Sequence, residues 1–493
     1  MRCRKLAWLS YHDREAPELR HDADAEMRIA EGRVVGAEAR RQRGEGAHVA
    51  PERTVAQATV VERTRAAMAD GAARIYEAGL SGGGAGVRAD ILERDPERAP
   101  GRADDAWTLI EVKSSKWPAK DNDREKKFAL HVPDVAIQAW AADQAGVPVS
   151  SVHLMYLNPD CEHPRLESLF TAVDVSSRIA PVVATMPEAM RTLRETLEMK
   201  QAPQVAVGEQ CDDPEQCPFY DRCHEPLPDH HVSELYYAKR HAAKFVAEGK
   251  TLISHLTEAD APTAPAKRQV RAVKSRERVV ERGLSEKLAA LKAPIYHLDF
   301  ETVQLAVPRW RGCRPQDMVA AQFSVHRELG DGQVQHLHHL ASRGEADPRP
   351  ALIAALVDAC RGAGTILVYY EQFEKSRLAE LATWFPEHAA DLHDIRDRIV
   401  DLLPIVRDHV YDPAFHGSFS LKTVLPALVP DLGYGDLEIQ EGSTAAAEIY
   451  RLLFAAELDP VVEADLRRDL LAYCQRDTEA MVRLLATLRT LAA

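Results

Sequence analysis

Apolar and polar residues alternate along the chain in patterns that divide it into three regions. Helical spacing of apolar positions covers residues 22–80, in DADAEMRIAEGRVVGAEARRQ and TVAQATVVERTRAAMADGAARIYEAG. Two strand-like segments follow, GVRADILE and AWTLIEVKSS, and the polar sequence RDPERAPGRADD predicts a loop between them. A helix in VPDVAIQAWAADQAG, a strand in SVHLMYLN and a long amphipathic helix near residues 181–200 complete this first region.

The remaining sequence predicts a charged helical segment and then a second region of mixed structure. Residues 231–292 have a helical pattern, within which EADAPTAPAKRQ predicts a flexible break. From APIYHLDFETV onward, strand and helix patterns alternate to the C-terminus, which is typical of a mixed α/β domain. We therefore expect an α/β protein with domains at residues 1–230 and 293–493, joined by a helical connector at 231–292.

Composition narrows the classes of protein that fit this pattern. The 493 residues are 45% hydrophobic and 28% charged, which is ordinary globular material for two or three domains. No apolar run approaches the roughly 18 residues that indicate a membrane span, and MRCRKLAWLS is too polar and too short for a signal peptide. We expect a cytoplasmic protein without a membrane partner. The net charge of −14 disfavours non-specific coating of nucleic acid, but it is compatible with a nuclease whose acidic pocket is neutralised by divalent metal.

Candidate chemistry begins in the two strand-like segments of the first region. If TLIEVKSS is a strand, Glu111 and Lys113 lie on one face, and a hairpin brings Asp90 beside Glu111. Two carboxylates can share a divalent metal, and a lysine can orient or deprotonate an attacking water. Taken alone, Glu-x-Lys is more often a charged surface strand. The order of Asp90 followed about twenty residues later by Glu111 and Lys113 in an apolar strand resembles the PD-(D/E)XK nuclease core. Gln138 in AIQAW then matches the glutamine of the helix that follows this core in RecB-type nucleases.

That resemblance has one departure at the predicted first helix. Many RecB-type nucleases have a histidine after a glycine there, whereas this chain has Gly36 where the histidine would fall. Glu38 could add a carboxylate, although a solvated helix face explains it as well. The resemblance therefore implies a Mg²⁺ or Mn²⁺ site that depends on Asp90 and Glu111.

Three cysteines stand close together in QCDDPEQCPFYDRC, at positions 211, 217 and 223. A subset of RecB-type nucleases holds a [4Fe-4S] cluster with three such cysteines and one near the N-terminus, here Cys3. The resemblance thus implies a cluster on Cys3, Cys211, Cys217 and Cys223, with structural Zn²⁺ or free thiols as alternatives. Related nucleases have two residues between the first two clustered cysteines, and this chain has five, so Cys161 is an alternative to Cys211. The isolated Cys313, Cys360 and Cys474 are expected to be packing residues.

A second acidic constellation lies in the C-terminal region. YHLDFETV as a strand places His297, Asp299 and Glu301 on one face, and two buried acids on one face need positive charge nearby. Glu374 follows a later strand, and a helix in LAYCQRDTEAM places Tyr473 and Asp477 four residues apart on one face.

This order of acids resembles the DEDDy exonucleases of the ribonuclease H-like superfamily. The resemblance implies that Asp299, Glu301, Glu374 and Asp477 hold two divalent ions for phosphodiester attack, with Tyr473 positioning the water. This chain has Glu374 where aspartate is common, and Glu371 where many relatives have a small polar residue. Asp401 is a rival carboxylate with a helix-surface role as its alternative. Lys422, Trp310 and Arg311 could contact phosphates or bases, or serve structural roles.

Nearly the whole chain resembles a bacterial family that fuses a RecB-like, cysteine-containing nuclease domain to a DEDD-type domain of unknown function. This implies a restriction-endonuclease-like core with helical additions, followed by a ribonuclease H-like mixed sheet with flanking helices. The expected function is metal-dependent hydrolysis of nucleic acid, with DNA favoured over RNA. The alternative is a nucleic-acid-binding or assembly protein in which one or both nuclease folds are inactive.

Overall fold

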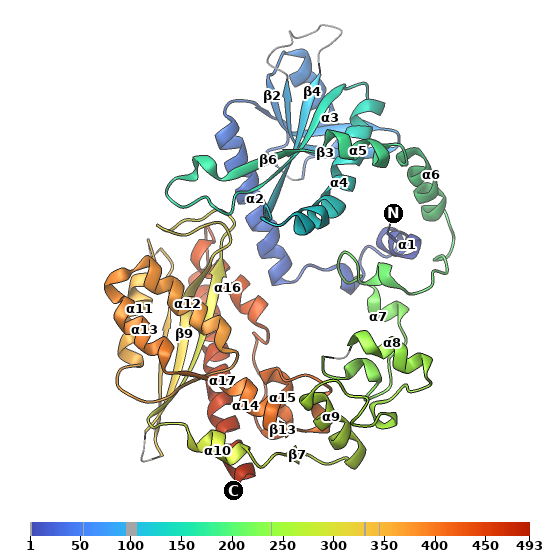
Figure 1. The fold of residues 1–493 in the computed structure, drawn as a ribbon. Helices are drawn as coiled ribbons and strands as arrows, with labels where there is room; N and C mark the ends of the chain where they lie inside the picture. The colour runs from blue at the N-terminus through green and yellow to red at the C-terminus, as the bar shows by residue number, and fades with distance from the viewer. Residues whose placement is uncertain (1, 53, 95–105, 238, 330–331, 345) are drawn as a thin grey trace. The chain divides into compact units, whose positions relative to one another are not determined.

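The computed structural model describes residues 2–52, 54–94, 106–237, 239–329, 332–344 and 346–493. The chain is mixed α/β, as the sequence predicts, and it forms two compact units (Figure 1). Unit 1 comprises Met1–Glu225 and Leu305–Asp317, and unit 2 comprises Pro226–Gln304 and Met318–Ala493. The predicted connector at residues 231–292 belongs to unit 2.

Unit 1 is built on a six-stranded sheet in the order β1-β2-β3-β4-β5-β6. Strands β1 and β2 pair in parallel, as do β4 and β5, and the other neighbours are antiparallel. The bounds are β1 Ala47–His48, β2 Arg74–Gly82, β3 Ala85–Arg94, β4 Trp107–Lys116, β5 Val149–Leu157 and β6 Phe170–Asp174.

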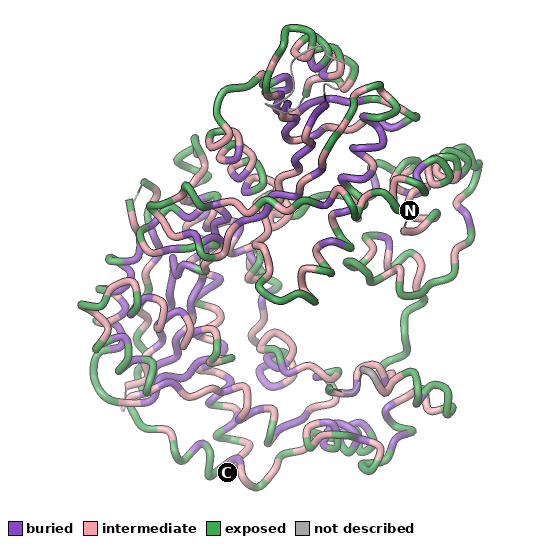
Figure 2. Tube along the Cα trace, turned by 45° about the horizontal axis from the view of Figure 1, so that its top comes forward, coloured by how far each residue is buried: buried purple, intermediate pink, exposed green. Residues whose placement is uncertain are grey.

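Helices cover both faces of this sheet. Helices α3 (Gln57–Ala69) and α4 (Asp121–Gln144) pack on the face that carries Leu92 and Leu109. Helix α2 (Ala23–Arg43) packs on the opposite face through Ala39, near Ile91 and Ile110. Both faces are therefore apolar, and Figure 2 shows buried residues along the strands. Helices α1 (Arg4–His12), α5 (Ser176–Val183), α6 (Met186–Leu197) and α7 (Tyr220–Cys223) complete unit 1.

Three sequence predictions for regular structure are wrong. Residues 74–82 form strand β2 rather than helix. Both faces of this strand are buried, with Ile75 on one face and Tyr76 on the other, so its sequence lacks the apolar and polar alternation that would have indicated a strand. The predicted helix near 181–200 is two helices, α5 and α6, and strand β6 precedes them. The predicted flexible break contains the start of helix α9 (Ala264–Ser275), which is capped by Thr263. Most of the predicted loop RDPERAPGRADD lies outside the described residues.

Unit 2 is built on a five-stranded sheet in the order β10-β9-β8-β11-β12. Strands β8, β9 and β10 are antiparallel to one another in turn, whereas β11 and β12 run parallel to β8. The bounds are β8 Ile295–Gln304, β9 Met318–Glu328, β10 Val334–Leu340, β11 Ile366–Val368 and β12 Ile399–Asp401. A two-stranded sheet pairs β7 (Val279–Val280) with β13 (Val410–Tyr411).

Helices pack around the second sheet. The core between β8, β9, α11 (Arg349–Ala359), α12 (Glu371–Trp384) and α13 (Ala389–Asp397) contains Leu298, Phe300 and Leu352. The long helix α17 (Pro460–Ala492) runs against β8 and β9. Helices α8 (Lys239–Ala247), α9, α10 (Leu284–Ala289), α14 (Leu402–His409), α15 (Leu421–Leu428) and α16 (Gly442–Phe454) also belong to unit 2.

The segment Leu305–Asp317, between β8 and β9, belongs to unit 1 by its contacts. Ala306 packs there beside Val35 and Leu157, and Trp310 is buried, which leaves its ring poorly placed to stack on bases. Across the part of the chain that the structure describes, no helix has both the length and the apolarity that a membrane crossing needs.

Candidate active sites

Three acids of unit 2 come together where β8 lies beside α17. Carboxylate oxygens of Asp299, Glu301 and Asp477 all lie within 4.8 Å of one another. Glu301 is buried, whereas Asp299 and Asp477 are partly exposed. Oxygen ligands at this separation suit a hard divalent cation such as Mg²⁺ or Mn²⁺.

Strand β8 presents its acids because its two faces have different neighbours. Leu298 and Phe300 point into the helix-covered core, so Asp299 and Glu301 point to the other face. The pairing of β8 with β9 shifts register directly after Glu301, a type of irregularity that re-aims side chains near functional sites. His297 shares this face, but its Nε2 contacts the Glu328 carboxylate at 2.7 Å, and it is not one of the three clustered acids.

Burial of like charges perturbs the three acids strongly. Burial raises the pKa of Asp299 well above its usual range, and the nearby charges of Asp477 and Glu301 raise it further. Burial also raises the pKa of Glu301 well above its usual range, and the nearby charge of Asp477 raises it further. Burial also raises the pKa of Asp477 to about 6. Ionising all three groups together is therefore unfavourable, and nearby positive charge would reduce this cost.

Glu374 lies in the first turn of α12 and contributes to this field. Its side chain is buried, its Oε2 atom has no hydrogen-bond partner, and burial raises its pKa to about 8. Its charge adds to the raised pKa of Asp299 and Glu301, although it lies outside the group of acids within 4.8 Å. An unpartnered buried carboxylate oxygen beside three acids is the feature expected of a residue that completes a metal site.

Tyrosine hydroxyls hold Asp477 in place. Tyr434, between α15 and α16, donates a hydrogen bond to Oδ1 of Asp477 at 2.5 Å. Tyr473 lies one turn earlier on α17, is buried, and also hydrogen-bonds Asp477, so the predicted pair on one helical face is confirmed. Sequence reasoning missed Tyr434, because a loop residue carries no periodic signal.

A thiol and a lysine complete the surroundings. The Cys474 sulfur lies 3.7 Å from Oδ2 of Asp299, and burial raises its pKa, so the expected packing residue also contacts an acid. The Lys422 Nζ lies over the rings of Tyr434 and Tyr473 at 5.5 and 5.4 Å, and it donates to the Glu441 carboxylate at 2.9 Å. Its positive charge lowers the pKa of Glu301 and Asp477 and opposes the effect of burial.

Asp401 has a structural role. Its carboxylate accepts hydrogen bonds from the backbone N–H groups of Leu403, Tyr370 and Glu371 at 2.9, 2.9 and 3.1 Å. Asp401 is thus the N-cap of α14 and fixes the start of α12, where Tyr370 has a left-handed φ of 86°. Its charge reaches Glu374 and raises the pKa of that carboxyl.

The predicted acids of unit 1 meet a lysine on the sheet. Lys113 Nζ lies 2.9 Å from Glu111 and 2.5 Å from Asp134, and Gln138 donates to Glu111 at 2.9 Å. The predicted common face of Glu111 and Lys113 on β4 is therefore confirmed. Asp134 was missed, although it precedes Gln138 by one helical turn and so shares its face. Burial lowers the pKa of Lys113, but Glu111 and Asp134 outweigh burial and raise it, so the lysine stays cationic.

Asp90 lies just beyond the last paired residues of β3 and β4. Its Oδ2 accepts the backbone N–H of Val112 at 2.7 Å. Burial raises its pKa well above the usual range, as does the Glu111 charge, and Glu77 adds to the effect. Glu77 interrupts the β2–β3 ladder with a left-handed φ of 59°, and its carboxylate lies 3.3 Å from Arg40. Glu77 was missed because its segment was predicted to be helical.

A cleft of about 830 Å³ opens onto Asp90. Arginines 33, 40 and 88 line it together with His48, Glu77 and Gly36, so cationic side chains surround acidic ones. Gly36 therefore lies where a side chain could reach the cleft, and a Cβ there would meet only Arg40 Nη1, at 3.6 Å. Glu38 instead pairs with Arg41 at 2.6 Å and accepts from Gln42, and it does not line the cleft.

The four predicted cysteine ligands line one small apolar pocket. Cys3, Cys211, Cys217 and Cys223 surround it together with Leu6, Leu9 and Phe219. All four are free thiols in the structure. Cys161 lies elsewhere, packed with Val35 and Leu157, and its thiol contacts the backbone oxygen of Arg165 at 3.3 Å. Cys211 thus remains the ligand candidate that lies with the other three.

The two ends of unit 1 are joined around this pocket. Arg2 donates to the backbone oxygens of Gln210 and Glu215, and Arg222 pairs with Asp13 at 2.7 Å and with Glu18 at 2.5 Å. These contacts connect residues more than 200 positions apart. A metal centre on the cysteines would add covalent links between the same segments.

Comparison with known proteins gives one family match. Residues 296–420 match the family described as Domain of unknown function (DUF2779). The matched segment contains Asp299, Glu301 and Glu374 and ends before Tyr473 and Asp477. No curated protein matches the chain.

The raised carboxyl pKa values predict how pH and metal affect the stability of unit 2. A carboxyl group whose pKa is higher in the folded than in the unfolded protein stabilises the folded state while it is protonated. This stability is fully present below the unfolded pKa and is lost as the pH rises through the folded pKa, which is about 6 for Asp477 and about 8 for Glu374. We expect the melting temperature in chelator to fall from about pH 5 to about pH 8 more steeply in wild type than in Asp477→Asn.

Mn²⁺ should reverse this trend in wild type, because metal binds the ionised carboxylates and displaces their protons. Differential scanning calorimetry with and without Mn²⁺ measures both effects. Identical pH profiles for wild type and Asp477→Asn would contradict the coupling of these carboxyl groups.

Proposed function

We propose that the chain is a metal-dependent nuclease whose principal active site lies in unit 2. The observation that carries this proposal is the convergence of Asp299, Glu301 and Asp477 within 4.8 Å, beside the unpartnered carboxylate of Glu374. This set supports the resemblance to DEDDy exonucleases. The mixed sheet with flanking helices is compatible with a ribonuclease H-like fold.

The chain's own groups have distinct roles in this proposal. Two divalent ions would be held by the four carboxylates, and they would supply Lewis-acid charge at the scissile phosphate. Tyr434 and Tyr473 orient Asp477 and, through it, the geometry of the site. Lys422 supplies a fixed positive charge at the edge of the acidic group, where a phosphate would approach.

A second hydrolytic site is proposed in unit 1, of the PD-(D/E)XK type. Asp90 and Glu111 would hold Mg²⁺ or Mn²⁺, and Gln138 orients Glu111. Because the pKa of Lys113 is raised, we assign it to positioning water and stabilising developing negative charge, rather than to removing a proton. The arginines of the cleft suit a polyanionic substrate.

The cysteine pocket of unit 1 is proposed to hold a [4Fe-4S] cluster. Four thiols in an apolar pocket suit iron–sulfur or zinc. Tetrahedral zinc with bonds of about 2.3 Å needs sulfur atoms about 3.8 Å apart. The described cysteines form no group of three ligand atoms within 4.8 Å, and the choice of iron–sulfur over zinc follows from the resemblance to cluster-containing RecB-type nucleases.

One observation favours the alternative that unit 1 is a nucleic-acid-binding platform. Gly36 lies in the cleft where RecB-type nucleases would have an imidazole, so one expected side chain is missing beside Asp90. DNA is favoured as substrate over RNA, because no described feature recognisably reads a 2′-hydroxyl group.

Activity of the principal site should depend on Asp299 and on its tyrosines. With labelled single-stranded DNA and Mn²⁺, Asp299→Asn should abolish cleavage by unit 2, because it removes a metal ligand. Tyr473→Phe should slow cleavage about 10- to 100-fold without removing Mn²⁺ binding. The control is Tyr237→Phe, since that side chain is exposed in the same unit. Full activity of Asp299→Asn in a chain that also lacks Lys113 would refute the assignment.

Activity of the second site should appear when the first is disabled. In an Asp299→Asn background, residual Mg²⁺- or Mn²⁺-dependent cleavage should fall at least about 100-fold on Lys113→Met. Lys126→Met is the matched control, because Lys126 is exposed on α4. If the Asp299→Asn chain is already inactive, Gly36→His should be added to it, because there is space for an imidazole at this position. A gain of cleavage would show that the missing histidine had made unit 1 inactive. Inactivity of both chains would favour the platform.

The cysteine pocket should bind iron. Protein purified without oxygen should be brown and contain about four irons per chain, and Cys217→Ser should lose the visible absorbance and destabilise unit 1. Cys161→Ala is the control, because its thiol lies outside the pocket. Stoichiometric zinc without iron would overturn the iron–sulfur assignment. Loss of colour in Cys161→Ala would show that Cys161, rather than Cys211, is the ligand.

A further inference from the structure

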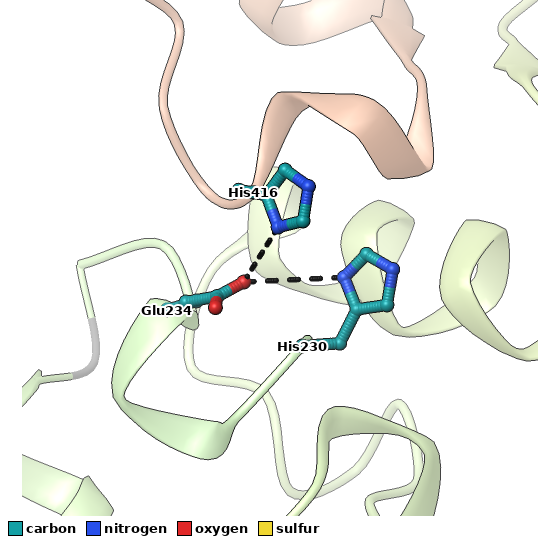
Figure 3. A group of neighbouring side chains, drawn as sticks. All are labelled: His230, Glu234 and His416. Carbon is teal, nitrogen blue, oxygen red and sulfur yellow. Dashed lines mark hydrogen bonds and ion pairs between the residues drawn. The ribbon is translucent and has the colours of Figure 1, made fainter. Parts of the chain in front are cut away.

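Two histidines and a glutamate of unit 2 form a group that neither proposed nuclease site includes. His230 precedes the short helix η4 (Val232–Glu234), Glu234 ends it, and His416 lies 182 residues beyond Glu234 (Figure 3). One ligand atom of each residue lies within 4.8 Å of the other two.

The three side chains converge on one point. Nδ1 of His416 lies 3.1 Å from Oε2 of Glu234, and Nδ1 of His230 lies 3.9 Å from the same oxygen. The two imidazole rings are stacked, with centroids 4.9 Å apart and planes inclined by 12°. Figure 3 shows both Nδ1 atoms turned toward the glutamate oxygen.

The backbone around the group is held closely. The Glu234 carbonyl accepts a hydrogen bond from Gln269, and Gly417 approaches that carbonyl so closely that a Cβ would lie 1.8 Å from it. Gly417 has a left-handed φ of 78°, and its N–H donates to the Tyr411 hydroxyl at 3.0 Å. The segment that carries His416 is therefore fixed against the segment that carries Glu234.

Hydrogen bonding within the protein leaves this group incomplete. Nδ1 of His230 is buried and has no hydrogen-bond partner, since 3.9 Å exceeds hydrogen-bonding distance. An unpartnered polar atom in a buried position is costly unless a ligand satisfies it. A cation among the three atoms would accept lone pairs from both nitrogens and the carboxylate at once.

We propose that His230, Glu234 and His416 form a Zn²⁺ site. Tetrahedral zinc with bonds of about 2.0–2.1 Å places its ligand atoms about 3.3 Å apart, close to the two separations from the Glu234 oxygen. Two imidazoles and one carboxylate favour zinc over Mg²⁺, which prefers oxygen ligands and bound water. His416 is 48% exposed, so the fourth position faces solvent and accepts water or an incoming ligand.

The site would join distant parts of unit 2. It connects the segment after Pro226 to the loop between β13 and α15, and so closes a long stretch of chain. Metal binding energy at such a link adds to the stability of the folded unit. This role is independent of the proposed nuclease chemistry.

The test is Zn²⁺ binding by the full, tag-free chain in excess Mg²⁺, which occupies oxygen-rich sites. Wild type should bind one more Zn²⁺ than His416→Ala or Glu234→Gln, in which affinity at this site should fall more than about 100-fold. The Co²⁺ difference spectrum of wild type minus His416→Ala, or minus Glu234→Gln, should be that of a tetrahedral site without the charge-transfer bands of thiolate ligands, because the cysteine pocket is common to all three chains. His393→Ala is the matched control, since His393 is an exposed histidine of the same unit.

Glu234→Gln separates the proposal from a purely structural role. Glutamine keeps a hydrogen-bond acceptor for His416 but lacks the carboxylate charge that zinc requires. Zn²⁺ should raise the melting temperature of wild type and His393→Ala by more than that of Glu234→Gln, which retains the cysteine pocket but lacks this site. Equal Zn²⁺ stoichiometry and equal melting shifts in wild type and Glu234→Gln would overturn the site, and unchanged far-ultraviolet circular dichroism would exclude misfolding as the reason for any loss.

Discussion

Carboxyl groups buried side by side impose the main constraint on unit 2. Moving ionised groups out of water costs free energy, and placing them near one another adds repulsion. Asp299, Glu301 and Asp477 incur both costs, and Glu374 adds its own buried oxygen. Such an arrangement persists only where the neighbouring structure fixes it, and it has a chemical rationale when cations occupy it. Neighbouring side chains fix these acids: Tyr434 donates a hydrogen bond to Asp477, and the Cys474 thiol contacts Asp299. The charge of Lys422 partly offsets the negative charge of Glu301.

Unit 1 meets a similar constraint with a cation of its own. Lys113 lies between Glu111 and Asp134 and forms ion pairs with both. Asp90 accepts a hydrogen bond from a backbone N–H group. The acids of unit 1 are therefore partly neutralised by the chain, whereas those of unit 2 would be neutralised by the proposed ions. We therefore place the proposed principal metal chemistry in unit 2.

Local spacing in the sequence placed several pairs of candidate residues together, although Asp134, one helical turn before Gln138, was missed. Period-two alternation placed Asp299 with Glu301 and Glu111 with Lys113, and helical spacing placed Tyr473 with Asp477. Residues brought in by the fold from irregular or misassigned segments were missed. Tyr434 lies in a loop, and Glu77 lies in a strand whose two buried faces conceal its alternation. His416 meets Glu234 only through long-range packing, which no local pattern records.

We propose that the acids of unit 2 hold a pair of divalent ions. Diffraction from crystals soaked in Mn²⁺, with data collected for its anomalous signal, tests this directly. We expect two Mn²⁺ peaks about 4 Å apart, in contact with Asp299, Glu301 and Asp477, with Glu374 turned toward one of them. Absence of Mn²⁺ from this position, with the three carboxyl groups still converged and Mn²⁺ bound elsewhere in the chain, would contradict it.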